Sequence, residues 1–354
     1  MYILSVGTSV PENKYSQDTI VSALSEKWAP GDATQKKKFE RIANSTTVAS
    51  RNLALPLESY LSGMDFSAQS KAFKSEALKL AVQSTQRALD EAGLSPEEVD
   101  MIAFTTVTGI SVPTIDALIC NAMNFRPDVK RIPLFGLGCV AGAAGTSRLH
   151  DYLEGHKTGV AILVSVELCS LTFQMNDPSP SNLIGSLLFG DGASTLVAIG
   201  NEHPLSKKTK APKTIGIRSR FFKDSEHIMG WDFGSHGFRL VLDPNVAGII
   251  KEHLRDEISS FLSDHKLKLE DVNTWVSHPG GPKVLLAIEE SLSLSNKELA
   301  LSWNQLRDYG NLSSSSVLFI LKDTMENRAH KPGDVGVMIA MGPGFCAEEV
   351  LLQW

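Results

Sequence analysis

The sequence predicts an α/β fold made of two similar halves. The same pattern of leucine, glutamate, a second acid and valine occurs at corresponding positions in residues 94–103 and 267–276. The two copies are about 173 residues apart. Each copy follows an amphipathic helix and leads into a strand. We place these elements at 75–92 and 101–106 in the first half, and at 246–262 and 274–276 in the second.

The same shift recurs at two further places. It brings Gly138-Cys139-Val140 opposite Gly310-Asn311-Leu312, within one residue, and a strand at 161–166 opposite one at 335–340. We therefore expect a pseudo-twofold axis, with Cys139 and Asn311 at equivalent helix starts close to it. The crevice between two such halves is a favoured position for a ligand site.

The polar, lysine-rich segment 203–212 is the natural connection between the copies. We expect an N-terminal half at 1–202 with the nucleophilic cysteine, and a C-terminal half at 213–354 with a histidine and an asparagine. Earlier in the chain we expect a strand at 1–7, a loop at 8–13, a helix at 16–28, a basic helical segment at 36–42 and irregular structure at 48–66.

Composition excludes several classes of protein. The 354 residues are 42% hydrophobic and 21% charged, with a formal net charge of -6, so electrostatics gives no case for nucleic acid or an anionic membrane. The four cysteines are far apart, without zinc spacings or a disulfide framework. We see neither a signal peptide nor a membrane-spanning run, and expect a cytoplasmic protein.

Cys139 is the leading candidate for a reactive residue. A strand at 129–135 stops at Gly136, and small residues that begin a helix follow the cysteine. A helix N-terminus favours the thiolate, and flanking glycine lets a substrate approach the sulfur closely. The alternative is a small buried hydrophobic residue without chemistry.

His278 and Asn311 lie in two further unusual segments. His278 ends a strand and enters the loop Pro279-Gly280-Gly281, and Asn311 takes an N-cap-like position. A structural histidine and a simple helix cap are the alternatives. With Cys139 they would form a nucleophile, a base that keeps a thiolate–imidazolium pair, and two donors to an oxyanion. The lack of an acidic third member argues against a hydrolase triad.

These segments, with further motifs, resemble the type III polyketide synthases, the chalcone synthase-like branch of the thiolase superfamily. The resemblance spans nearly the whole chain, and the His278 loop together with the loop 342–345 is highly specific. The motifs are Gly138-Cys139, residues 188–193, Gly237-Phe238, residues 278–281, residues 310–313 and residues 341–345.

The resemblance implies the thiolase-like five-layered α/β/α/β/α fold, a homodimer and a set of catalytic roles. Cys139 would hold the acyl chain, whereas His278 and Asn311 would bind the malonyl carbonyl and stabilise the enolate after decarboxylation. It implies no metal and no cofactor besides the coenzyme A (CoA) thioester substrates, malonyl-CoA and an acyl-CoA starter. We also find no dinucleotide-binding fingerprint.

The resemblance also assigns residues around the substrate. Phe189 and Phe238 would be aromatic gatekeepers, and Lys38 and Arg41 would contact CoA phosphates, although the third basic position of the family is Ser45 here. The positions expected to line the cavity are Val107, Cys169, Thr172, Met229, Ser313, Gly342, Pro343 and Gly344.

Val107, Cys169 and Met229 depart from the plant pattern and resemble bacterial members. We therefore expect a fatty acyl starter and an alkylpyrone or alkylresorcinol product. Asn44 and residues 140–144 resemble the phloroglucinol-forming branch, so a phloroglucinol or tetrahydroxynaphthalene synthase that uses malonyl-CoA alone is the close alternative. More distant alternatives are a ketoacyl-ACP synthase III-like enzyme and an inactive acyl-CoA-binding module.

Overall fold

Two sets of strands with matching topology, joined into one nine-stranded sheet, form the framework of the molecule. The computed structural model describes residues 1–177, 179–234, 237–327 and 329–354, and its largest sheet has nine strands in the order β11-β12-β13-β8-β1-β7-β6-β4-β5. The strands of the first half are β1 (Tyr2–Ser9), β4 (Met101–Thr106), β5 (Lys130–Phe135), β6 (Val160–Leu168) and β7 (Asp191–Ile199). Those of the second half are β8 (Lys213–Phe221), β11 (Val272–Ser277), β12 (Val335–Gly342) and β13 (Cys346–Gln353).

The pairing pattern of the first half is repeated in the second. In order, β4-β6-β7-β1 pair as parallel, antiparallel and antiparallel, and β11-β12-β13-β8 pair in the same way. The two sets meet where β1 and β8 pair at Tyr2 and Lys213 alone. This agreement confirms the duplicated α/β architecture; the boundaries of the halves at 202 and 213 stay a prediction.

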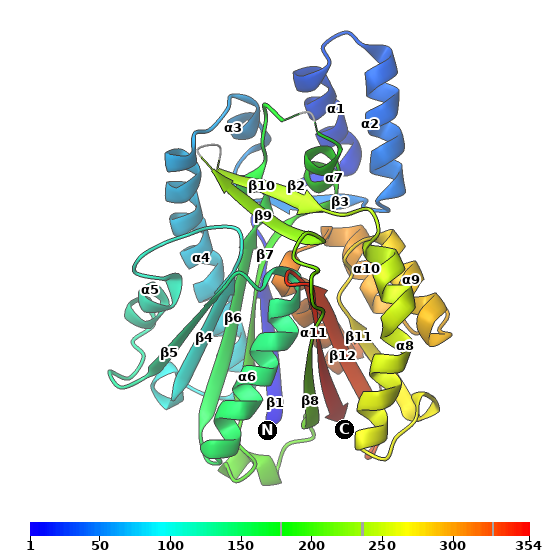
Figure 1. Ribbon diagram of the computed structural model, residues 1–354. Helices are drawn as coiled ribbons and strands as arrows, with labels where there is room; N and C mark the ends of the chain where they lie inside the picture. The colour runs from blue at the N-terminus through cyan, green and yellow to red at the C-terminus, as the bar shows by residue number, and fades with distance from the viewer. Residues whose placement is uncertain (178, 235–236, 328) are drawn as a thin grey trace.

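Five layers follow from the faces of these strands (Figure 1). The long helix α4 (Phe66–Ala92) and α5 (Ile115–Ala122) cover one outer face, and α6 (Ala141–Gly155) and α11 (Ser316–Asn327) lie between the two sets of strands. The other outer face is covered by α8 (Val246–Asp264), α9 (Pro282–Leu292) and α10 (Ala300–Tyr309). The expected α/β/α/β/α fold is confirmed.

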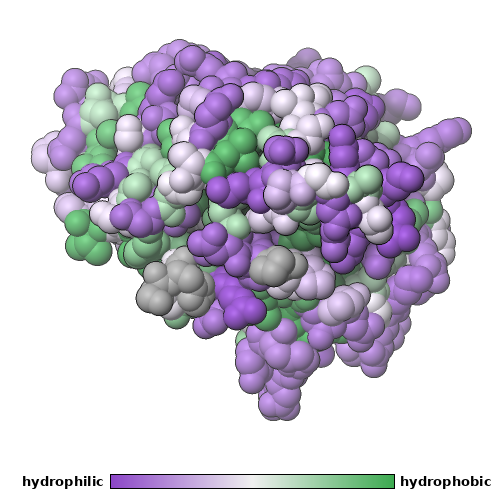
Figure 2. Space-filling model, turned by 90° about the horizontal axis from the view of Figure 1, so that it is seen from above, coloured by the Kyte–Doolittle hydropathy of each residue, from purple (hydrophilic) through white to green (hydrophobic). Residues whose placement is uncertain are grey.

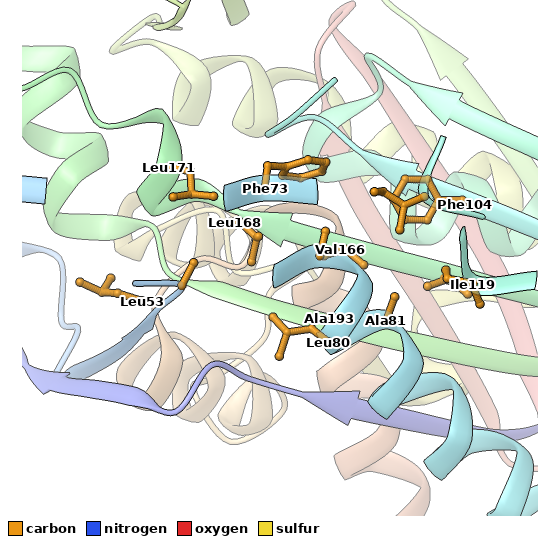
Figure 3. Packing of buried hydrophobic residues seen from close by; sticks show 14 of the residues in the cluster. Leu53, Phe73, Leu80, Ala81, Phe104, Ile119, Val166, Leu168, Leu171 and Ala193 are labelled. Atoms are coloured by element: carbon orange, nitrogen blue, oxygen red, sulfur yellow. The ribbon is translucent and has the colours of Figure 1, made fainter. Parts of the chain in front are cut away.

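Strands buried on both faces explain the long apolar runs in the sequence. Along β6, Ile162 and Val164 pack in the cluster under α4, whereas Leu163 joins the central cluster with α6 and α11. In β12, Val337 and Met338 divide in the same way between the outer and the central cluster. Figure 3 shows side chains of the first cluster between α4 and the strands.

Smaller elements lie at the upper end of the molecule in Figure 1. They include the helices α1 (Gln17–Trp28), α2 (Ala33–Ser45), α3 (Leu57–Leu61) and α7 (Pro180–Leu188), and the strand pairs β2 (Asn13–Ser16) with β3 (Ser50–Leu53) and β9 (Met229–Gly234) with β10 (Gly237–Leu242). Short 3₁₀ helices are η1 (Pro96–Glu98), η2 (Gly138–Val140), η3 (Cys169–Thr172), η4 (Pro204–Lys207), η5 (Leu269–Asp271) and η6 (Ser313–Ser315).

Two expectations for the N-terminal region are wrong. Residues 48–66 contain β3 and α3 instead of irregular structure, and α4 begins at Phe66, well before residue 75. The Asp65 side chain caps α4 by accepting from the Ala68 N–H at 2.7 Å. The first turns of α4 are largely polar, so hydrophobic periodicity gives no sign of them. Among the described residues, no helix is long and apolar enough to cross a membrane.

Candidate active site

A cavity of about 370 Å³ brings together the three residues predicted to be catalytic. Its wall includes Cys139 from η2, His278 from the end of β11 and Asn311 from the turn before η6. Cys139 lies within η2, whereas Asn311 lies just before η6, the corresponding 3₁₀ helix of the second half, so the two positions correspond only approximately. The cavity also contains Ser313, whose hydroxyl accepts from the Cys139 thiol at 3.6 Å.

The position of Cys139 is set by a turn that requires glycine. Gly138 has φ +54°, and a Cβ added there would lie 2.8 Å from Cδ of Pro343. A side chain at 138 would therefore be strained and would also displace the cavity wall. The Cys139 side chain then stands at the start of the helical run η2–α6, 8% exposed and facing the cavity.

Backbone and side-chain bonds together fix Asn311. Its N–H donates to the Leu188 carbonyl at 2.9 Å, and its carbonyl accepts from the Gly190 N–H at 3.0 Å. Its Oδ1 accepts from the Ser313 N–H at 2.7 Å, which is the expected cap-like bond. Its Nδ2 donates to the Gly280 carbonyl at 3.2 Å and so links the asparagine to the histidine loop. The Asn311 side chain also interacts with the Cys139 thiol and so links the two predicted catalytic residues.

His278 is buried without a partner for its ring. The side chain is 4% exposed, and neither Nδ1 nor Nε2 has a hydrogen-bond partner among the described residues. The backbone N–H of His278 donates to the Ile339 carbonyl at 2.9 Å, which places the residue at the edge of the second sheet. A buried unpaired polar group is costly, and the two nitrogens face a cavity that can hold a polar ligand.

Burial holds both reactive groups in their neutral forms. It raises the pKa of the Cys139 thiol to about 12, an effect that the hydrogen bonds to Ser313 and Asn311 oppose. Burial also lowers the pKa of His278 to about 3. No hydrogen bond joins the two side chains in the described part of the chain. The structure thus differs from the expected standing thiolate–imidazolium pair, because each group is desolvated without the other as its partner.

Glu167 is a buried acid behind the cavity wall that was not identified from the sequence. This fully buried carboxylate of β6 accepts from the Val107 N–H at 3.1 Å and from the Thr108 hydroxyl at 2.9 Å. The Ser314 hydroxyl donates to its other oxygen. Burial raises its pKa. The signal in the sequence was an acidic residue inside an otherwise apolar strand, because a buried carboxylate needs several hydrogen-bond partners.

The expected cavity residues divide into two groups. Val107, Cys169, Phe189, Met229, Ser313 and Pro343 line the cavity, whereas Thr172, Phe238, Gly342 and Gly344 do not. Phe238 packs against Phe66, Trp231 and Phe233, and the Thr172 hydroxyl donates to the Cys169 carbonyl at 2.7 Å. A gatekeeper role for Phe238 and a substrate role for each of these residues stay predictions.

Part of the cavity wall is apolar, and its residues were not predicted from the sequence. It comes from α7, the β9–β10 pair and the first turns of α8, which only the tertiary fold brings together. The residues are Ile184, Leu188, Trp231, Leu240, Leu242, Val246, Ala247 and Ile250.

The predicted CoA-binding residues lie at the periphery. Lys38 and Arg41 are exposed on α2 and do not line the cavity, whereas Ile42, Ser45 and Thr46 at the end of the same helix do. Contact of Lys38 and Arg41 with CoA stays a prediction. Within the described ranges, no group of three or more His, Cys, Asp and Glu side chains is arranged to hold a metal ion.

Comparison with known proteins gives matches along the whole chain. The family model for the N-terminal domain of chalcone and stilbene synthases matches residues 1–203, and that for their C-terminal domain matches residues 217–354. A 1,3,6,8-tetrahydroxynaphthalene synthase of Streptomyces peucetius subsp. caesius is 42% identical, over 99% of this chain and 93% of the relative. A phloroglucinol synthase of Pseudomonas fluorescens is 28% identical, over 97% of this chain and 96% of the relative.

A solved structure agrees closely with this fold. The 1,3,6,8-tetrahydroxynaphthalene synthase of Streptomyces coelicolor A3(2), described as a bacterial type III polyketide synthase, superimposes with a TM-score of 0.93 at 27% identity. The match covers 100% of this chain and 99% of the other. The likeness therefore extends to both halves and to the elements that carry the cavity.

The pKa values predict how Cys139 reacts with iodoacetamide in the free protein. Because the thiolate reacts and its pKa is raised to about 12, the alkylation rate should be low at pH 7 and increase about tenfold per pH unit up to pH 10. The measurement is the labelled fraction of the Cys139 peptide by mass spectrometry. A rate independent of pH between 6 and 8, lost in His278→Ala, would instead establish a standing ion pair.

Proposed function

The chain belongs to the type III polyketide synthases of the chalcone and stilbene synthase family, and we propose that it condenses malonyl-CoA units on Cys139. The observation that carries the proposal is a single cavity wall with a thiol, an unpartnered imidazole and an amide. CoA thioesters enter as substrates, and no resident cofactor is needed. The cytoplasmic location stays a prediction.

Acyl loading begins with attack of the Cys139 sulfur on the carbonyl carbon of a CoA thioester. A new C–S bond forms, the bond to CoA breaks, and CoA leaves as a thiol after protonation. His278 accepts the proton of the Cys139 thiol as substrate fills the cavity. The two charges created attract each other strongly in a water-poor cavity, which offsets the desolvation that each suffers alone.

Chain extension requires loss of CO₂ from a malonyl thioester. The electrons of the broken C–C bond move to the thioester oxygen and form an enolate. The imidazole of His278 and the second amide N–H of Asn311 donate to that oxygen where charge develops. The enolate carbon then attacks the acyl carbonyl on Cys139, so that a C–C bond forms, the bond to the Cys139 sulfur breaks and the lengthened chain is held by CoA. For the next cycle the Cys139 sulfur attacks this new CoA thioester, and CoA leaves as before.

We propose malonyl-CoA as the only substrate and a tetrahydroxynaphthalene-type product. A synthase of this type is the close alternative that the sequence predicts. We place it before the alkylpyrone or alkylresorcinol synthase. It is supported by the 42% identical relative, which is named as a 1,3,6,8-tetrahydroxynaphthalene synthase and is matched over nearly its whole length.

One observation favours an alkylpyrone or alkylresorcinol synthase as the second candidate. The cavity has an apolar region, lined by residues such as Ile184, Leu240, Leu242 and Ile250. A fatty acyl chain of a starter would be stabilised there by about 0.8 kcal/mol for each buried CH₂ group. Malonyl units alone would gain little from these side chains.

We also propose that the protein is a homodimer. Val112 is 91% exposed in the loop after β4, and the neighbouring Ile110 is half exposed. Phe135 and Phe233 are also half exposed, and their rings are 6.2 Å apart. Figure 2 shows hydrophobic residues at the surface of the upper face. Exposed large apolar groups of this kind are typical of a protein interface.

Product analysis by mass spectrometry distinguishes the two candidate reactions. Purified protein is incubated with malonyl-CoA alone and with starters from acetyl-CoA to palmitoyl-CoA. We expect one product from malonyl-CoA alone, with a mass that does not change with the starter. Product masses that increase with starter length would contradict the first choice and support the alkylpyrone or alkylresorcinol synthase.

Activity with carrier-protein thioesters but not with CoA thioesters would support the ketoacyl-ACP synthase III-like alternative. A Cys139→Ala variant that bound acyl-CoA and kept the full biological effect would support the inactive binding module. The first result would contradict malonyl-CoA as the donor, and the second would contradict a catalytic role for Cys139.

Size-exclusion chromatography with light scattering tests the dimer. The wild-type protein should have about twice the 38.4 kDa mass of the chain, and Val112→Asp should shift it toward the monomer, because a charge would be buried in the interface. Leu286→Asp, at an exposed apolar position on α9, is the matched control and should leave the mass unchanged. A monomeric wild-type protein would refute the proposal.

A further inference from the structure

Arg51 of β3 is a buried cation at the carboxyl end of α7. The helix ends at Leu188, so the carbonyl groups of its last turn have no donors within the helix. Nη1 of Arg51 donates to the Ser186 carbonyl at 2.7 Å and to the Phe189 carbonyl at 2.6 Å. The positive charge is favourable there, because the carboxyl end of a helix is the negative end of its dipole. Arg51 therefore caps the end of α7.

Asn311 binds to the same helix end as Arg51. Its N–H donates to the carbonyl of Leu188, which lies in the chain between the two carbonyls that Arg51 binds. Phe189 and Asn311 also form an isolated parallel β-bridge. The aliphatic part of Arg51 lies close to Gly310, since a Cβ added to that glycine would be 3.0 Å from Cδ of Arg51. Arg51 thus contacts both the segment that pairs with Asn311 and the residue that precedes it.

Arg51 is buried without a hydrogen-bonded carboxylate in the described part of the chain. Its side chain is fully buried, and Nε and Nη2 have no hydrogen-bond partner among those residues. Burial lowers the pKa of Arg51 to about 10, an effect that the Asp191 carboxylate opposes. That carboxylate accepts from the N–H groups of Ala54 and Ser170 at 2.6 and 2.8 Å. Because a buried charge is costly, the two carbonyls that Arg51 holds are the contacts that account for its position.

We propose that Arg51 is a positioning residue for Asn311, which keeps the Asn311 amide directed at the oxyanion of the enolate by holding the end of α7. A donor stabilises the transition state best when it is in place before charge develops. Arg51 is not part of the cavity wall, so it acts through Asn311 and does not touch the substrate. This inference rests on the proposed function, since it assumes that Asn311 stabilises the enolate.

Acetyl-CoA release from malonyl-CoA in a Cys139→Ala background measures decarboxylation alone. There Arg51→Met should lower kcat about tenfold and change KM by about twofold or less, because the amide loses its fixed direction while the cavity wall keeps its side chains. Arg51→Lys keeps a cation that can donate to both carbonyls, but it is shorter, and should lose about threefold in kcat. Gln17→Leu is the matched control, since it removes only a 2.7 Å bond to the Leu187 carbonyl of the same helix end and should leave kcat unchanged.

An Asn311→Ala background distinguishes positioning from general damage to the fold. If Arg51 acts through Asn311, Arg51→Met should have no further effect on kcat once the amide is absent. An equal loss with and without the amide would overturn the proposal, as would an unchanged kcat with the amide present. If Arg51→Met does not fold, the same comparison with Arg51→Lys decides between these results.

Hydrogen–deuterium exchange separates this inference from the proposed function, because it needs no turnover. Arg51→Met should increase exchange about tenfold in the peptides that contain the N–H groups of Gly190, Asn311 and Ser313, which join the segments around Asn311. Strand β12 should stay as protected as in the wild type. If Asn311→Ala left acetyl-CoA release unchanged, the proposed role of Asn311 would fail, whereas faster exchange would still support Arg51 as the residue that positions it. Unchanged exchange would overturn the inference.

Discussion

The site depends on the close approach of the two central helical runs, η2–α6 and η6–α11. A Cβ added to Gly142 of α6 would lie 2.3 Å from the carbonyl oxygen of Ser314 and 2.5 Å from a methyl group of Val317. Only glycine permits this contact between α6 and the second half of the molecule. Because Cys139 and Ser313 stand at the starts of these two runs, the contact also brings their side chains to 3.6 Å.

A buried carboxylate stabilises the same junction from the side of the first sheet. Glu167 links the segment that carries Val107 and Thr108 to Ser314 of the second half, so one acid connects two walls of the cavity. Asn311 makes a similar connection, since it binds both the segment after α7 and the histidine loop. Cys139 and Asn311 are thus held by hydrogen bonds that cross the pseudo-twofold junction, which limits their freedom before substrate arrives.

The sequence was informative where the internal repeat and the motifs with reactive side chains fall in the same segments. The repeat predicted two similar α/β halves with Cys139 and Asn311 near their junction, and the motif resemblance identified the family. The apolar wall was not predictable, because Ile184, Leu240 and Ile250 come from separate elements whose packing alone makes them neighbours. The thiolate–imidazolium pair was expected from the sequence but is not found in the structure. A pattern of residues does not report how far burial desolvates each group.

The central claim is that His278 and Asn311 promote decarboxylation, whereas Cys139 carries the chain. The most direct measurement is acetyl-CoA release from malonyl-CoA by Cys139→Ala, alone and combined with His278→Ala or Asn311→Ala. We expect the single variant to release acetyl-CoA without condensed product, and each double variant to be slower by about 100-fold or more, since an oxyanion donor is lost. Equal release by the single and double variants would contradict this account.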